Sequence, residues 1–263
     1  MKNNYVAACL ILLLFWSLKT FGTIVVLNGL THQHTGSDGS IFTGKIKLKN
    51  DGDKPEKFVA YKQDMLFSCG KGEVFSSTET HDRSLKNWLK TSTDGKSLSA
   101  GEEYDLFYTV NIPRQVDRKG TYWLVIMIEP GEPISNSEKN GLNIASKVRY
   151  AVQVLVDLGS FESPKMIFED VRLKKTQISS RLVEVQLKNE GLFSVRTKMQ
   201  LEIYDAKGQK VKTLEGRSRR VFPEKCSNFE IEVSDLPKGK YDGVLVADNG
   251  RGLFGSNLTI EIE

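Results

Sequence analysis

Three histidines carry most of the chemistry that this chain could do: His32, His34 and His81. His32 and His34 are two positions apart, so on a β-strand they would share one face and could bind a metal ion together. A zinc site needs three or four protein ligands, and no further ligand stands at a suitable spacing. We therefore expect no metal site, and we expect these two histidines to lie in a solvent-facing loop.

His81 is followed by Asp82, which is a pair found in catalytic triads, but no serine or cysteine stands in a context that would activate it. The sequence also lacks a nucleophile elbow, a glycine-rich phosphate loop and a His-Glu-x-x-His zinc motif. The sequence thus predicts no catalytic residue, no cofactor and no enzymatic activity.

Cysteine use is sparse. Apart from Cys9 in the N-terminal leader, the cysteines are Cys69 and Cys226, and neither has a neighbour at metal-ligand spacing. We expect two small, buried or half-buried thiols. The alternative is a disulfide between the two halves of the chain, which requires an oxidising compartment and two Cα atoms within about 7 Å.

The charge balance is mildly basic, with a formal net charge of +4, and Arg217-Ser218-Arg219-Arg220 is the one dense basic run. We expect this run to be an exposed hairpin loop that its charge keeps soluble and unpaired. A site for an anionic ligand is the alternative. Because aromatic residues are not interleaved with the basic ones, nucleic acid is not expected as a partner.

An internal repeat supplies the elements that position these residues. Residues 48–52 (Leu-Lys-Asn-Asp-Gly) return as 187–191 (Leu-Lys-Asn-Glu-Gly), and 119–122 (Lys-Gly-Thr-Tyr) return as 238–241 (Lys-Gly-Lys-Tyr). In each copy the first run closes an apolar strand and enters a turn. Two copies of one strand-turn-strand plan follow, and the first copy contains an insertion that we place near residues 65–97.

Frequent glycine turns, many β-branched and aromatic residues, and hardly any 3.6-residue periodicity predict an all-β fold of two β-sandwich domains. We place the first domain at residues 23–158 and the second at 159–263. Residues 1–22 have the pattern of a signal peptide, with Lys2 before an apolar run and small residues around Gly22. We expect export and cleavage near Gly22, which leaves a mature chain without a transmembrane segment; an uncleaved anchor is the alternative.

Residues 148–156 carry apolar side chains at every second position, from Val148 to Val156, as an edge strand that offers a row of side chains to a partner would. The same alternation is required of a last strand that is buried in its own sandwich, and we favour that interpretation. Trp123 follows Tyr122, so the two side chains must point to opposite faces of their strand. If Tyr122 is inside, Trp123 is an anchor for a partner or packs against the insertion or the other domain.

Several short motifs of the first half carry a family resemblance. They are residues 48–55, Ser84 with Trp88, residues 98–102, and Gly120 with Tyr122. Together they resemble the N-terminal immunoglobulin-like domain of bacterial WxL-interacting proteins. Residues 221–229 and 236–241 resemble the C-terminal domain of that family. The resemblance implies two tandem immunoglobulin-like β-sandwich domains and a binding role at the cell envelope.

The same residues are similar, more weakly, to periplasmic pilus chaperones, which are two-domain immunoglobulin-like proteins that lend a strand to unfinished subunits. This resemblance implies that Lys147 and Arg149 bind a subunit carboxylate at the last strand of the first domain.

We therefore predict an exported, non-enzymatic binding protein of the bacterial cell envelope, located in the periplasm or at the cell surface. It would recognise an envelope or surface protein, or a cell-wall polysaccharide, through its β-sandwich surfaces. The alternatives are a periplasmic pilus-type assembly chaperone that donates a strand, or a structural spacer. The candidate partner-binding residues are Trp123, Val148, Arg149, Tyr150, Val152 and Val154.

Overall fold

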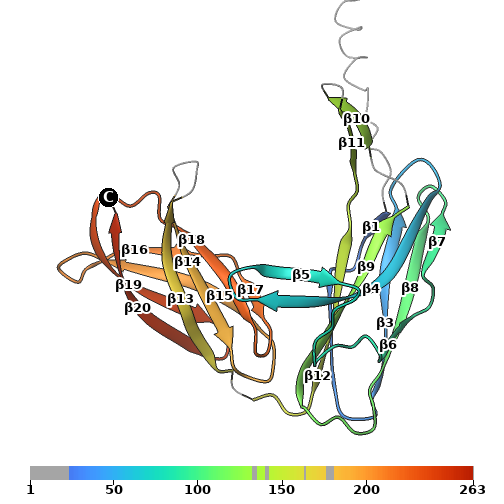
Figure 1. Ribbon diagram of the computed structural model, residues 1–263, viewed down its shortest axis with the longest axis horizontal. Coiled ribbons are helices and arrows are strands. Elements are labelled where there is room, and N and C mark those ends of the chain that lie inside the picture. Colours follow the sequence, from blue (N-terminus) through green and yellow to red (C-terminus); the bar gives the residue numbers. More distant parts are fainter. Residues whose placement is uncertain (1–23, 132–134, 140–141, 163, 176–180, 263) are drawn as a thin grey trace, which may run out of the picture.

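The structure is a computed structural model, and it describes residues 24–131, 135–139, 142–162, 164–175 and 181–262 (Figure 1). The expected signal peptide lies outside these residues. Within them every regular element is a β-strand, and no helix is long and apolar enough to cross a membrane. The prediction of an all-β fold with two immunoglobulin-like sandwiches is confirmed.

Two sheets form the first sandwich. One sheet has the order β1-β3-β8-β6, and the other has the order β2-β12-β9-β4-β5, with β7 also paired to β4. Beyond them, β10 and β11 form a separate two-stranded ribbon. The bounds are β1 (Ile24–Val26), β2 (Thr31–Gly36), β3 (Ile41–Asn50), β4 (Glu56–Ser68), β5 (Gly72–Ser76), β6 (Leu89–Thr91), β7 (Gly95–Leu98), β8 (Glu103–Asn111), β9 (Gly120–Pro130), β10 (Ser135–Lys139), β11 (Leu142–Ser146) and β12 (Tyr150–Leu158).

The second sandwich pairs a sheet of order β13-β14-β18 with a sheet of order β16-β15-β19-β20, and β17 is joined to β15. The bounds are β13 (Met166–Lys175), β14 (Arg181–Asn189), β15 (Val195–Tyr204), β16 (Lys210–Glu215), β17 (Arg219–Val221), β18 (Cys226–Glu232), β19 (Gly239–Asp248) and β20 (Leu253–Ile262). Among the described residues, β13 to β20 pair only with one another. The domain limits of 23–158 and 159–263 remain a prediction.

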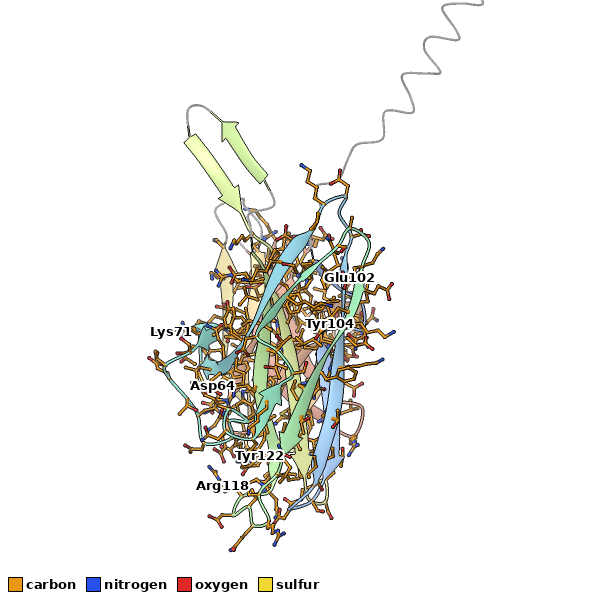
Figure 2. The ribbon with its side chains drawn as sticks, turned by 90° about the vertical axis from the view of Figure 1, so that its right-hand side faces the viewer. Asp64, Lys71, Glu102, Tyr104, Arg118 and Tyr122 are labelled. Atoms are coloured by element: carbon orange, nitrogen blue, oxygen red, sulfur yellow. A yellow bond between two sulfur atoms is a disulfide. The ribbon has the colours of Figure 1, made fainter. Side chains whose placement is uncertain are left out.

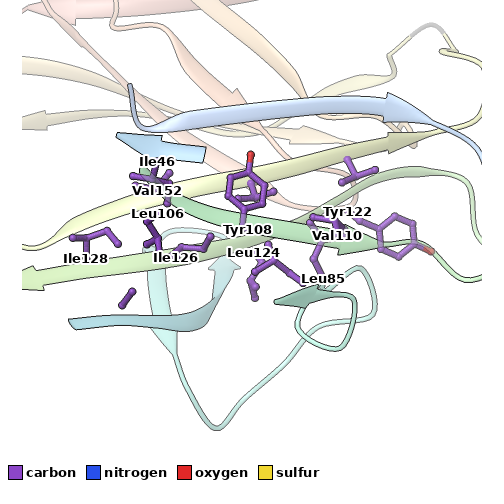
Figure 3. Packing of buried hydrophobic residues seen from close by; sticks show 14 of the residues in the cluster. Ile46, Leu85, Leu106, Tyr108, Val110, Tyr122, Leu124, Ile126, Ile128 and Val152 are labelled. Carbon is purple, nitrogen blue, oxygen red and sulfur yellow. The ribbon is translucent and has the colours of Figure 1, made fainter. Parts of the chain in front are cut away.

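The core of the first sandwich follows from strand alternation. On β8, Leu106, Tyr108 and Val110 are buried, whereas Phe107 between them is exposed. Figure 3 shows Tyr108 within the cluster that these residues form with strands of the facing sheet. Gly44 lies opposite Tyr108 on β3, and a Cβ atom there would come within 2.2 Å of the Tyr108 hydroxyl. Glycine at position 44 thus leaves the space that the buried tyrosine ring fills.

The internal repeat is visible as two buried asparagines with the same hydrogen bonds. Asn50 Nδ2 donates to the carbonyls of Lys54 (2.7 Å) and Leu98 (3.0 Å), and its Oδ1 accepts from the Gly52 amide (3.0 Å). In the second copy, Asn189 Nδ2 donates to the carbonyls of Phe193 (2.8 Å) and Val221 (3.1 Å), and its Oδ1 accepts from the Gly191 amide (2.8 Å). Each asparagine therefore joins the turn that follows its own strand to a strand distant in sequence.

The tyrosines of the repeat are also equivalent. Tyr122 Oη donates to the carbonyl of Arg118 at 2.8 Å, and Tyr241 Oη donates to the carbonyl of Pro237 at 3.1 Å. Each hydroxyl thereby fixes the turn before its own strand, as a tyrosine corner does.

The insertion forms a bridge between the sandwiches. The hairpin of β4 and β5 leaves the first sandwich and crosses to the second (Figure 1). At its tip Cys69 forms a disulfide with Cys226 on β18, with Cα atoms 5.1 Å apart. The expectation of two free thiols was therefore wrong. The two cysteines come from different domains, and it is the crossing of the hairpin that brings them together.

Candidate functional site

The edge of β12 is paired along only part of its length. On one side, β9 pairs with the whole of β12, from Tyr150 to Leu158. On the other side, β2 pairs in parallel with β12 from Gln153 to Leu158. Among the described residues no strand lies against this side of residues 150–152. This stretch therefore has backbone groups that can accept a further strand.

The unpaired side continues away from the sandwich. Residues 147–149 precede β12 and are exposed, and β11 before them pairs with β10 only. Figures 1 and 2 show that the β10–β11 ribbon projects well beyond both sandwiches. From Leu142 to Val152 the chain thus has one edge without a partner strand in the described residues. Eleven extended residues correspond to about 36 Å of edge.

The candidate residues of this segment divide into two groups. Val152 and Val154 have no exposed surface and belong to the core of the first sandwich, as the favoured interpretation of a buried last strand requires. Val148 is 41 % exposed, Arg149 is exposed, and Tyr150 is half-buried against the core. A partner can therefore contact the side chains of residues 148–150, whereas at Val152 it can contact only the backbone edge.

A polar cluster holds the base of the ribbon. Glu129 on β9 accepts a hydrogen bond from Tyr61 Oη at 3.0 Å and another from Lys147 Nζ at 3.2 Å, and Arg149 Nε lies 4.0 Å away. Burial raises the pKa of Glu129, but the Tyr61 and Lys147 hydrogen bonds, together with the positive charges of Lys147 and Arg149, hold the pKa below its usual value. Lys147 and Arg149, the residues expected to bind a carboxylate of a partner, face a carboxylate of this chain.

Trp123 lies on the face of β9 opposite Tyr122, as expected, but only 1 % of it is exposed. Its Nε1 donates to the Met65 carbonyl at 2.9 Å. Its ring packs edge-on against Phe67 of the insertion. The ring of Phe222, from the second domain, also packs against it, with the two centroids 4.8 Å apart. The prediction that Trp123 is an exposed anchor for a partner was therefore wrong. Its alternative is confirmed, because Trp123 packs against both the insertion and the other domain.

A buried ionisable pair lies beside this aromatic cluster. His81 stacks on Trp123 with ring centroids 4.1 Å apart, and its Nε2 is 3.3 Å from Oδ1 of the fully buried Asp64. Burial lowers the pKa of His81 to about 4, although the Asp64 carboxylate acts in the opposite direction. The partner of His81 is thus Asp64 and not Asp82. A cavity of about 280 Å³ between the domains adjoins the pair, and Arg83 and Glu224 are among its lining residues.

His32 and His34 share a face of β2, as their spacing predicts, but they do not lie in a loop. His32 Nδ1 and His34 Nε2 are each 3.0 Å from the Tyr108 hydroxyl. Burial lowers the pKa of both histidines, so neutral rings are favoured. One neutral ring can donate to the hydroxyl while the other accepts from it, which satisfies the buried tyrosine. Among the described residues no group of three or more His, Cys, Asp or Glu side chains could hold a metal ion.

Polar residues that the sequence analysis did not select join the two domains. The amide of Thr121 donates to the Leu192 carbonyl at 2.9 Å, and the amide of Ser194 donates to Thr121 Oγ1 at 2.8 Å. Arg118 pairs with Glu224 at 2.5 Å. The repeat places Thr121 at a strand start, but no local pattern shows that this strand start faces the second domain.

No protein-family model and no curated protein matches this sequence, so the resemblance to WxL-interacting proteins finds no support. The chain is similar in structure to solved pilus chaperones. The YadV chaperone is 12 % identical and covers 90 % of this chain and 99 % of its own, with a TM-score of 0.45. The second match is the CsuC chaperone in its pre-assembly complex with the tip subunit CsuE, from Acinetobacter baumannii. It is 12 % identical and covers 89 % of this chain and 97 % of its own, with a TM-score of 0.48.

The class 5 fimbriae chaperone CfaA is a further match, with 9 % identity, 89 % coverage of this chain, 98 % of its own and a TM-score of 0.46.

Proposed function

We propose that this protein is an exported, non-enzymatic binding protein of the cell envelope, and that it pairs an extended segment of a partner polypeptide with the free edge that runs from Leu142 to Val152. The observation that carries the proposal is the parallel pairing of β2, which begins at Gln153 and leaves the preceding edge open. Strand addition to such an edge gives affinity through main-chain hydrogen bonds. A pilus-type assembly chaperone in the periplasm is the specific form of this proposal, with a fibre subunit as the partner.

The open edge is unlike an edge that is protected against pairing. Natural sheets blunt their edges with charges, prolines, bulges or short strands. Here the charged residues Lys147 and Arg149 contact Glu129, while Val148 between them is exposed. The side chains that would repel an incoming strand are thus engaged on this chain's own surface.

A photo-crosslinking residue at position 148 tests the proposal in cells that export the protein. The matched control carries the same residue at Val211 on β16, which is exposed to a similar degree (51 % against 41 %) and lies on the other domain. We expect a polypeptide crosslinked at 148 and not at 211, and slowed amide hydrogen exchange from 142 to 152 in the purified complex. Equal crosslinking at both positions, or a complex without protection of this edge, would contradict strand addition.

A rigid spacer is the second candidate, and the disulfide between Cys69 and Cys226 favours it because it fixes the two sandwiches to one another. The Gln153 amide donates to the Leu30 carbonyl on the β2 side of β12, so strand alternation directs the Ala151 amide to the same side, where no strand lies among the described residues. The variant Ala151→Pro therefore distinguishes the two functions. Proline has no amide hydrogen to donate, so it weakens pairing at an edge. A spacer would keep its partner in this variant, whereas a strand-pairing protein would lose it.

A further inference from the structure

Two strands of the first sandwich bring three possible metal ligands to one point. His32 and His34 lie on the same face of β2, and Tyr108 lies on β8 of the facing sheet. His32 Nδ1 and His34 Nε2 are each 3.0 Å from the Tyr108 hydroxyl oxygen. Tyr108 is 74 positions from His34 in the sequence, so the spacing of the histidines could not indicate it as a third ligand. The fold thus adds a phenol to the two imidazoles.

The distances between these three atoms match those between neighbouring ligands of one metal ion. Imidazole nitrogens and protein oxygens bind a zinc-sized ion at about 2.0 to 2.1 Å. Two such ligands at a right angle around the ion lie about 2.9 Å apart, whereas two at the tetrahedral angle lie about 3.3 Å apart. The observed 3.0 Å, which is the same for both histidines, is closer to the right angle. An ion between the three atoms would thus see the phenol oxygen at about 90° from each imidazole nitrogen.

The cluster is open to solvent on one side and rigid on the other. Among the described residues β2 pairs only with β12, so its other edge is open. His32 and His34 are half-buried there, whereas only 1 % of Tyr108 is exposed. The His34 ring also stacks on Phe42, with centroids 5.1 Å apart, which holds its orientation. An ion can therefore enter from the β2 edge, and water can complete its ligands on that side.

The ligand types and their angles favour copper among the divalent metals. Nitrogen and oxygen ligands at right angles are typical of Cu²⁺ and Ni²⁺, whereas Zn²⁺ sites are mostly tetrahedral. Of these ions, Cu²⁺ is bound most tightly by a given set of nitrogen and oxygen ligands. Cys69 and Cys226, whose thiolates would compete for copper, are joined in a disulfide. A disulfide is also typical of an oxidising compartment, in which copper stays divalent.

We propose that His32, His34 and Tyr108 form a binding site for one Cu²⁺ ion. Two Cu–N bonds form with lone pairs of neutral imidazoles, and a Cu–O bond replaces the O–H bond of the phenol. The proton passes to the solvent and the copper remains divalent. The ion would join β2 of one sheet to β8 of the other. Because the pairing of β2 ends at Gln153, copper would fix the strand that limits the free edge, whether or not a partner strand adds to that edge.

Titration of the purified exported protein with copper(II) chloride tests the site, with glycine as a competing chelator to remove weakly bound copper. We expect one copper ion per chain and a visible absorption band from phenolate-to-Cu²⁺ charge transfer, which imidazole ligands alone do not give. Tyr108→Phe keeps the ring and removes the oxygen, so it should abolish the band. Even groups that only orient a metal ligand contribute about 10- to 100-fold to affinity, so the loss of this ligand should weaken binding about tenfold or more.

Tyr204→Phe on β15 of the second sandwich is the matched control, and it should change neither the band nor the affinity. His34→Phe keeps an aromatic ring against Phe42 and should weaken binding about tenfold or more. Melting temperatures without metal show which variants are folded. If Tyr108→Phe fails to fold, the band of the wild-type protein and the loss in His34→Phe still test the site. Absence of binding in glycine, binding without the band, a band that persists in Tyr108→Phe, or an equal loss in Tyr204→Phe would overturn the proposal.

Discussion

Removal of the interdomain disulfide provides the sharpest test of how the two sandwiches are held together. The bond joins residues separated by 157 positions, so it closes a loop that contains most of both domains. In the chain-entropy model, a loop of this length reduces the entropy of the unfolded chain by an amount worth about 5 kcal/mol at 25 °C. Measured losses are usually smaller, so for Cys69→Ala with Cys226→Ala we expect about 2 to 5 kcal/mol.

Urea denaturation followed by tryptophan fluorescence measures this loss. With an m-value of about 2 to 3 kcal/mol/M, the midpoint should fall by about 1 to 2 M. Wild-type protein with a reducing agent is the matched control, because it keeps both sulfur atoms and loses only the bond. Since Cys226 is 5 % exposed, any excess loss in the double variant measures its packing. A midpoint that stays the same on reduction would refute the argument from loop closure.

The aromatic contacts at the interface predict what reduction leaves intact. Phe67 stacks on Phe222 with centroids 4.7 Å apart, and both contact Trp123. These rings, and not the disulfide, cover the apolar face of β9. We therefore expect reduced and oxidised protein to have the same radius of gyration by small-angle X-ray scattering in the absence of urea. An expanded reduced form would show that the disulfide alone sets the arrangement of the domains.

Three further predictions concern the buried polar and aromatic groups. Asn189→Ala leaves two buried carbonyls without their donor and should reduce the free energy of unfolding by about 2 to 4 kcal/mol in thermal denaturation, with a similar loss for Asn50→Ala. Trp123→Ala should cost about 3 to 5 kcal/mol in urea denaturation, and an unchanged midpoint would show that the ring is not packed as described. Burial lowers the pKa of His34 and His81, so the native state favours their neutral forms. The contribution of these histidines to the free energy of unfolding is fully present above pH 6.5 and should be lost as the pH decreases towards 4. In a pH series of melting temperatures, His34→Phe should make this decrease shallower.

The repeat explains why much of the fold could be predicted from sequence. The bonds that each asparagine makes within its own turn, and the bond that each tyrosine makes to the preceding turn, reach neighbours within four residues, so they recur wherever the local sequence recurs. Asn50 and Asn189, and Tyr122 and Tyr241, show this in hydrogen bonds of the same pattern. Local chemistry of this kind can be read from one sequence.

The parts that could not be predicted depend on contacts between distant segments. Strand alternation assigned Trp123 to the correct face of β9, but its burial follows from the insertion and from Phe222. The disulfide required the β4–β5 hairpin to cross to the second domain. We expected His32 and His34 in a loop because residues 31–36 have no continuous apolar face. They lie on a strand because the Tyr108 hydroxyl of the other sheet provides a hydrogen-bond partner for both half-buried rings.

The free edge of β12 originates in a change of sheet by the first strand. Residues 24–26 pair with β3 in one sheet, and residues 31–36 pair with β12 in the other, so the chain crosses between the sheets over residues 27–30. Gly29 has a φ of 85° in this crossing, a value that glycine adopts without strain. If residues 24–30 had stayed in the sheet of β12, they would lie against the residues that precede Gln153 and would cover this edge. Because of this crossing, β2 covers β12 only from Gln153 to Leu158. The same local turn that completes the fold therefore determines where the free edge, to which we propose that a partner strand adds, comes to an end.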